Sequence, residues 1–97
     1  MDNFTENDFR ILKSILDRGD KKKGLTLACG TTIEEIVNKT ELSDKKVRDT
    51  INKFKDAGYV GEGIKKVRTK TYILTKEGFL FLKNVRINIF GEDVNNE

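Results

Sequence analysis

The sequence contains no histidine, no proline, no tryptophan and a single cysteine, Cys29. Without histidine, the side chain that most often acts as a general base and binds zinc is missing. One cysteine excludes an intramolecular disulfide, and no imidazole is present to activate its thiol. We therefore interpret Cys29 as a small, partly buried residue, and we expect neither an enzyme nor a metal or other cofactor.

Long apolar runs are also lacking. No stretch approaches the roughly 18 uncharged apolar residues of a membrane-spanning helix, and Asp2, Glu6 and Asp8 stand where a signal peptide carries no acid. We therefore expect a cytoplasmic protein that does not contact a membrane. The 97 residues suffice for one hydrophobic core, and we assign residues 1–91 to a single domain and 92–97 to a flexible acidic tail.

Positive charge is unevenly distributed along the chain. The net charge is +3, but residues 43–71 contain nine lysines and arginines against four acids, a local excess of five positive charges. The remainder is therefore net negative by two. Such segregation within one small domain favours a face that meets a polyanion, although lysine-rich faces often contact only solvent.

Capping residues and apolar residues at helical spacing predict four helices. A threonine or serine stands at each expected start, where its hydroxyl can accept a hydrogen bond from a free N–H of the first turn. Thr31 and Thr32 each precede a glutamate by three residues, so a capping box begins the second, short helix in either register. The helices are expected to start after Thr5, after Thr31 or Thr32, after Ser43 and after Thr75; the first, third and last cover residues 6–18, 44–56 and 76–89.

Two segments are typical of strands. After Gly58 the sequence changes to Tyr59 and Val60, and a charged stretch interrupted by glycines then leads to a return strand at residues 71–74, so we predict a hairpin with a basic tip. The short apolar segment at residues 25–29 is expected to form a brief strand that pairs with this hairpin.

The third predicted helix has one apolar side and one polar side. Val47, Ile51 and Phe54 follow helical spacing and are expected to face the core. The opposite side is polar and mostly basic. It carries Lys45, Asp49 and Asn52, with Arg48 along one edge and Lys46 and Lys53 along the other.

The order of these elements and four stretches of sequence resemble the winged helix-turn-helix superfamily. The stretches are the helix start TTIEEIV at 31–37, the turn LSDKKV at 42–47, the helix exit KDAGYV at 55–60 and the return strand YILTKEG at 72–78. The resemblance implies a mainly helical α+β fold with a three-helix core, a β-hairpin wing and a C-terminal helix. It also implies double-stranded DNA as the partner, with the third helix in the major groove and the wing on phosphates or in the minor groove.

The resemblance further implies which residues contact DNA. Lysine and arginine can reach guanine, Asn52 can pair with an adenine edge, and a hydroxyl at a helix start can bind a phosphate. Asp49 is discordant, because phosphates repel a carboxylate unless it binds a cytosine amino group or a neighbouring arginine. Lysines at a hairpin edge can also serve only to prevent aggregation. The candidates are Thr32, Ser43, Lys45, Lys46, Arg48, Asn52 and Lys53 in the helices and Lys65, Lys66, Arg68 and Lys70 in the wing.

The last predicted helix carries more apolar side chains than one core-facing side needs. A second copy of the chain is the simplest cover for the excess, and a homodimer presents two recognition helices about one DNA turn apart. A patch for another protein is the alternative. No pocket for a small-molecule ligand is evident. The residues expected at the dimer interface are Phe4, Ile11, Phe81, Val85 and Ile89.

Three functions follow from the resemblance. The first is a transcriptional regulator of repressor type, which blocks polymerase by occupying an operator, because the chain has no room for a catalytic or activating domain. The second is a DNA-partition adaptor, similar to the small winged-helix proteins that bind plasmid or phage centromeres. The third is a winged-helix module that binds protein and not DNA. The sequence alone leaves these alternatives open.

Overall fold

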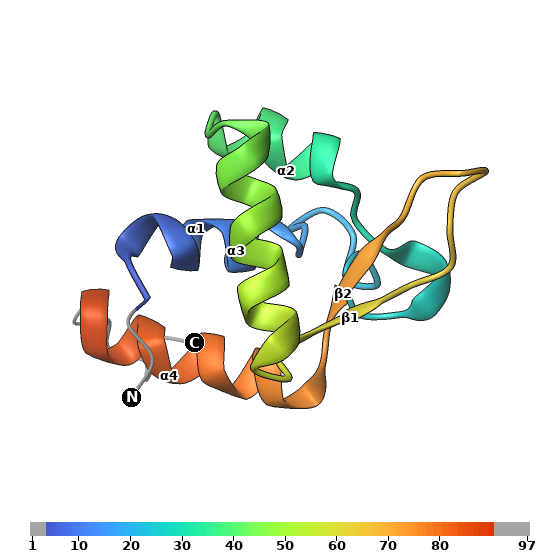
Figure 1. The fold of residues 1–97 in the computed structure, drawn as a ribbon. Coiled ribbons are helices and arrows are strands. Elements are labelled where there is room, and N and C mark those ends of the chain that lie inside the picture. Colours follow the sequence, from blue (N-terminus) through green and yellow to red (C-terminus); the bar gives the residue numbers. More distant parts are fainter. Residues whose placement is uncertain (1–3, 91–97) are drawn as a thin grey trace.

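The structure, a computed structural model, describes residues 4–90, with side chains as far as Asn84. Its elements are α1 (Glu6–Ser14), the 3-10 helix η1 (Leu27–Cys29), α2 (Ile33–Thr40), α3 (Asp44–Asp56), β1 (Val60–Glu62), β2 (Tyr72–Leu74) and α4 (Lys76–Phe90). The expected mainly helical α+β fold is confirmed (Figure 1). None of the described helices has the length and apolarity needed to span a membrane. The predicted tail, residues 92–97, lies outside the described residues.

The predicted helix starts are correct. Thr5 and Thr32 each form a capping box: the threonine hydroxyl accepts a hydrogen bond from the N–H three residues on, and the acid there, Asp8 or Glu35, accepts one from the threonine N–H. The Ser43 hydroxyl accepts a hydrogen bond from the Lys46 N–H in the first turn of α3. These starts are predictable because all the groups of a cap lie within four residues of one another.

The helix α1 ends at Ser14, earlier than the sequence predicts, because tertiary contacts take up the carbonyl groups that follow. Lys39 of α2 donates from Nζ to the carbonyl oxygens of Ser14 and Leu16, at 3.0 and 3.1 Å. The Thr31 hydroxyl donates to the Ile15 carbonyl at 2.6 Å. A lysine is favourable here because the carbonyl end of a helix is partially negative. These bonds tie α1 to the start and end of α2.

The prediction of a strand at residues 25–29 is wrong. Most of that segment forms η1, and the pairing with the hairpin occurs slightly later, where Thr31 and Tyr72 exchange two backbone hydrogen bonds of 2.8 Å each. The Leu27 carbonyl also accepts a hydrogen bond from the Ile64 N–H at 2.8 Å. The segment therefore supports the base of the hairpin without being a strand.

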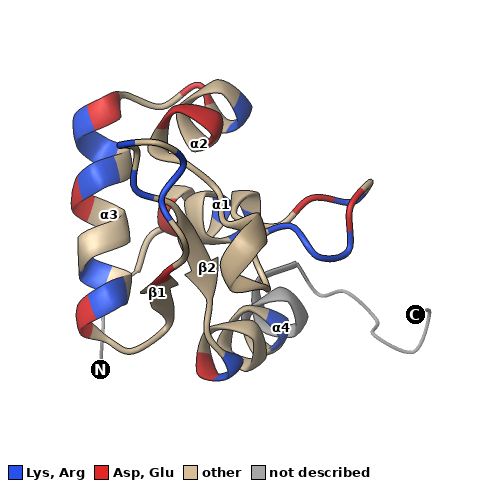
Figure 2. Ribbon diagram, turned by 90° about the vertical axis from the view of Figure 1, so that its right-hand side faces the viewer, with Lys and Arg blue, Asp and Glu red and all other residues tan. Residues whose placement is uncertain are grey.

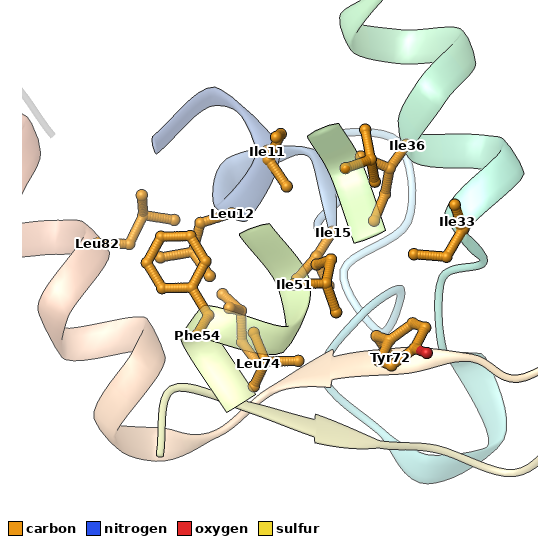
Figure 3. Packing of buried hydrophobic residues seen from close by; sticks show 12 residues of the cluster. Ile11, Leu12, Ile15, Ile33, Ile36, Ile51, Phe54, Tyr72, Leu74 and Leu82 are labelled. Carbon is orange, nitrogen blue, oxygen red and sulfur yellow. The ribbon is translucent and has the colours of Figure 1, made fainter. Parts of the chain in front are cut away.

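A single apolar core lies where α1, α2 and α3 meet, and β2 and α4 close it (Figure 3). The three side chains predicted to face the core from α3 are all buried, so the opposite side of that helix is turned outward. The buried cluster consists of Ile11, Leu12, Ile15, Ile33, Ile36, Val47, Ile51, Phe54, Val60, Tyr72, Leu74 and Leu82.

The strands β1 and β2 form an antiparallel pair in which Val60 lies opposite Leu74. We call residues 60–74 the wing and residues 65–70 the wing tip; the hairpin extends away from the helices in Figure 1. Close packing fixes its base, since a Cβ added to Gly78 of α4 would lie 2.0 Å from the Tyr59 carbonyl oxygen. Only glycine permits this approach of the helix to the chain that enters β1.

Candidate nucleic-acid interface

The outer side of α3 is open to solvent, as the sequence predicts. The side chains of Lys45 and Arg48 are 86% and 60% exposed, and Asn52 is exposed as well. In Figure 2 the charged residues of α3 lie along one margin of the molecule. The major groove of B-form DNA is wide enough for one such helix.

The cations of this outer side already have acidic partners on the same helix. Lys45 Nζ lies 2.9 Å from Asp49 Oδ2, and Arg48 Nε donates to Asp44 Oδ1, both across one helical turn. The hydrogen bond to Asp44 raises the pKa of Arg48 above its ordinary value. Exposed pairs of this kind stabilise a helix only weakly, so a phosphate or base can displace the carboxylate.

The cations along the other edge of α3 point to a buried carboxylate of α1. Asp8 is fully buried, and its oxygens lie 2.7 Å from Lys46 Nζ and 3.1 Å from Lys53 Nζ. Burial opposes ionisation, but hydrogen bonds from Lys46, from the Thr5 N–H and from Lys53 prevail, and the pKa of Asp8 lies well below its usual range. Both lysines were predicted to contact DNA, and this stays a prediction; in the structure they hold α3 against α1.

The wing tip carries the second group of predicted cations. Lys65, Lys66, Arg68 and Lys70 are all exposed. Within residues 4–84, no acid lies within ion-pair distance of the first three, whereas Lys70 Nζ lies 4.0 Å from Glu62. Glu62 itself is paired mainly with Lys55 of α3, at 2.7 Å, and this hydrogen bond lowers the pKa of Glu62. The Lys55 pair links the end of α3 to β1.

A groove of about 550 Å³ separates the start of α3 from the wing. Arg48 of α3 lines it on one side, and Arg68 and Lys70 line it on the other, so the fold brings together cations that lie twenty residues apart in the sequence. In Figure 2 the wing, with its basic stretch in blue, points toward the viewer. The complete lining is Ile33, Glu34, Val37, Asp44, Arg48, Arg68, Thr69, Lys70 and Tyr72.

Comparison with solved structures identifies the architecture. The DNA-binding TubR fragment of Clostridium botulinum matches with a TM-score of 0.64 and 29% identity, over 86% of this chain and 98% of that one. A MarR-family transcriptional regulator from Rhodococcus sp. RHA1 matches with a TM-score of 0.72 and 11% identity, over 91% of this chain and 56% of that one. The MepR–DNA complex of S. aureus matches with a TM-score of 0.65 and 16% identity, over 91% of this chain and 65% of that one.

The chain has the winged helix-turn-helix fold. It spans nearly the whole TubR fragment but only about half of the MarR-family regulator. No protein-family model matches the sequence, and no curated protein matches it. Within the winged-helix arrangement, α2 and α3 are the helix-turn-helix and residues 60–74 are the wing.

Two predicted DNA contacts of the helix-turn-helix also cap helices, as the sequence predicts. Thr32 is only 9% exposed, and its hydroxyl is hydrogen-bonded within the capping box to Glu35. Ser43 is exposed, but its hydroxyl accepts the Lys46 N–H. Glu35 in turn forms an ion pair with Lys23 at 2.9 Å. Burial alone would raise the pKa of Glu35, but hydrogen bonds from the Thr32 N–H and from Lys23 lower it below its ordinary value. Both hydroxyls therefore fix helix starts.

The residues predicted for a dimer interface occupy different environments. Ile11 is fully buried in the core of its own chain, which corrects the expectation that it meets a second copy. Phe4 stacks on Phe54 with centroids 4.7 Å apart, and Phe81 stacks on Tyr59 at 4.3 Å, so both rings pack mainly within the chain. The side chains of Val85 and Ile89 lie outside the described residues. On α4, Phe79 and Leu80 remain 43% and 49% exposed.

Some residues of the interface were not predicted from the sequence. Asp44 and Glu62, which neutralise cations of α3, lie at the groove and at β1. The spacing of Asp44 and Arg48 is that of a helical ion pair and could have revealed the first. No local pattern indicates that Asp8 contacts Lys46, which is 38 residues away. Among the described residues, no cluster of cysteine and acidic side chains is suited to hold a metal ion.

Proposed function

We propose that this chain binds double-stranded DNA with some sequence preference, through α3 in the major groove and the wing on the backbone. The observation that carries the proposal is the groove between Arg48 on α3 and Arg68 and Lys70 on the wing, next to an uncovered helix face. Arginine and lysine on both sides of a groove suit phosphates, and Arg48 and Asn52 have the donors needed to read guanine and adenine. The fold shared with the MepR–DNA complex supports this arrangement.

The role that we propose first is regulation of transcription, by occupation of an operator. This role is supported by the winged-helix fold that the chain shares with a MarR-family regulator. The second candidate is a partition adaptor, which is favoured by the 29% identity to the DNA-binding TubR fragment over nearly all of that chain. Both roles require sequence-dependent binding to duplex DNA, and they differ in how the sites are arranged.

A homodimer is part of the proposal. The exposed Phe79 and Leu80 of α4 give an apolar surface on the side of the fold that does not carry the groove. Burial of such side chains between two copies is favourable by roughly 25 cal/mol per Å² of apolar surface. Two recognition helices about one DNA turn apart then match a site with two-fold symmetry.

The test is selection of bound duplexes from random DNA, followed by footprinting of the selected sites and light scattering with and without DNA. A single palindromic footprint occupied by one dimer supports the regulator. An array of direct repeats that is coated cooperatively supports the adaptor. Failure to enrich any duplex at about 50 mM salt, where phosphate contacts are strongest, overturns DNA binding and leaves the protein-interaction module.

A further inference from the structure

The wing ends in an apolar side chain held out to solvent. Val67 is 96% exposed, the largest exposure among the exposed apolar residues of the described chain. Its neighbours Lys66 and Arg68 are exposed cations without an ion pair among the described acids. An apolar residue this exposed in a basic hairpin gains nothing from the core, and it weakens the solubility that lysines give to a hairpin edge.

The backbone at this residue is also unfavourable. Lys66 and Thr69 exchange two backbone hydrogen bonds of 2.9 and 2.8 Å, which makes Val67 and Arg68 a two-residue hairpin turn. Val67 has a φ of +56°, and Arg68 does not have a positive φ. A positive φ at the first of the two turn positions is the requirement of a type II′ turn, in which glycine is preferred. A β-branched residue is among the least suited to this conformation.

The other positive-φ residues have an explanation within the fold. Glu41 ends α2 as a left-handed cap, a common conformation at the ends of helices. Gly24 and Gly58 are glycines, which adopt a positive φ without strain. Val67 has neither a capping role nor a buried contact to offset its strain, and strained residues that the fold retains concentrate at functional sites.

We propose that Val67 is a specificity-determining residue, which enters the minor groove as an apolar wedge against one base step. This inference rests on the proposed DNA-binding function. In this arrangement Lys66 and Arg68 contact phosphates on the two sides of the groove, and Val67 lies between them in the turn. Apolar wedges partly unstack the step that they contact, and pyrimidine–purine steps unstack most easily. The wing therefore reads DNA by deformability and not only by charge.

Two substitutions of Val67 separate the effect of the apolar side chain from that of the strain, and a third substitution is the control. Val67→Asn tolerates the positive φ and removes the wedge, so the midpoint of thermal unfolding rises by roughly 5 °C, while affinity for the selected duplex falls roughly tenfold. Val67→Thr keeps the branched shape and the strain but replaces a methyl by a hydroxyl, so its affinity falls without the gain in stability. Ile64→Thr removes an exposed apolar side chain at the base of the wing and serves as the control, with an unchanged step preference.

The direct measurement is the fluorescence of 2-aminopurine placed at the step under the wing, which hydroxyl-radical footprinting locates. We expect saturating wild-type protein and the Ile64→Thr variant to raise the fluorescence by unstacking the base, and Val67→Asn to leave it low at saturation. If Val67→Asn retains the affinity, step preference and fluorescence of the wild type, Val67 is only a turn residue. If the wild-type chain binds no duplex, the DNA-binding function fails and this inference fails with it.

Discussion

The helix α3 and the wing tip are both basic, but their cations have different surroundings. On α3, Lys45, Lys46, Arg48, Lys53 and Lys55 each lie within ion-pair distance of a carboxylate. At the wing tip, Lys65, Lys66 and Arg68 have no such partner among the described acids. The count of positive charges along the sequence does not reveal this difference, because it depends on which acids the fold brings close.

For the proposed DNA binding, this difference predicts a division of labour between α3 and the wing tip. Paired cations contribute little net charge to long-range attraction, whereas unpaired cations release counterions from phosphates and give the binding its salt dependence. We therefore expect the helix to read base edges, with Asn52 and Arg48 as hydrogen-bond donors. The cations of the wing tip are suited to attachment to phosphates. Four experiments address this comparison.

The largest effect is expected from the wing. Replacing Lys65, Lys66 and Arg68 together by alanine removes three phosphate contacts, so the slope of log affinity against log salt falls by roughly three units. At about 0.1 M salt the affinity then drops by two to three orders of magnitude. Fluorescence anisotropy over a salt series measures both quantities.

The control for the wing variant changes the same net charge elsewhere. Lys13, Lys21 and Lys22 are exposed and lie outside α3 and the wing. Their joint replacement by alanine leaves the slope close to that of the wild type. An equal loss of affinity and of salt slope in both triple variants would mean that overall charge, and not the wing, attracts the DNA.

The second effect concerns how α3 is held. Asp8→Asn leaves two lysines beside a buried neutral amide, so the free energy of unfolding falls by about 3 kcal/mol at neutral pH. Because the pKa of Asp8 is lower in the folded chain than the roughly 3.9 of an unfolded aspartate, this stabilisation is complete above that value. It is lost as pH falls through the folded pKa.

Urea unfolding followed by circular dichroism at several pH values measures the contribution of Asp8. The gap between the wild type and Asp8→Asn should close in acid. The exposed Asp49→Asn change is the control and costs less than about 0.5 kcal/mol. A gap that is equal at all pH values would show that Asp8 acts through packing and not through its charge.

The third effect separates reading from attachment. Arg48→Ala or Asn52→Ala reduces the discrimination between the selected duplex and a scrambled one by about 1–3 kcal/mol. Lys66→Ala weakens binding to both duplexes to the same extent, because a phosphate contact carries no sequence information. Competition assays at fixed salt give the ratio of the affinities for the selected and the scrambled duplex. The comparison breaks down if Lys66→Ala changes the ratio as much as Arg48→Ala does.

The smallest effect concerns a carboxylate on the reading face. Asp49→Asn releases Lys45 from its ion pair and removes a charge that phosphates repel, so the affinity for duplex DNA rises by less than about 1 kcal/mol. Titration of the selected duplex measures the change. A loss of affinity instead would show that Asp49 accepts a hydrogen bond from a cytosine amino group.

The sequence predicted the parts of the candidate interface that depend on spacing along one helix. The apolar side of α3 and the exposure of Lys45, Arg48 and Asn52 follow from a period of 3.6 residues, and the structure confirms them. The same reasoning did not predict that Lys46 and Lys53 pair with Asp8, since this carboxylate lies on another helix. The prediction that Ile11 lies at a dimer interface failed for a related reason. Helical spacing shows that a residue lies on the apolar side of its helix, but not which part of the molecule covers that side.

The sequence by itself determined where the helices begin, that a hairpin separates α3 from α4, and that positive charge gathers between residues 43 and 71. These features depend on groups that are close along the chain. Only the tertiary structure decided that Asp8 of α1 neutralises Lys46 and Lys53, and that Thr31, not a strand at residues 25–29, pairs with the hairpin at Tyr72. Those outcomes depend on contacts between distant segments, whose hydrogen bonds and charges no local pattern records.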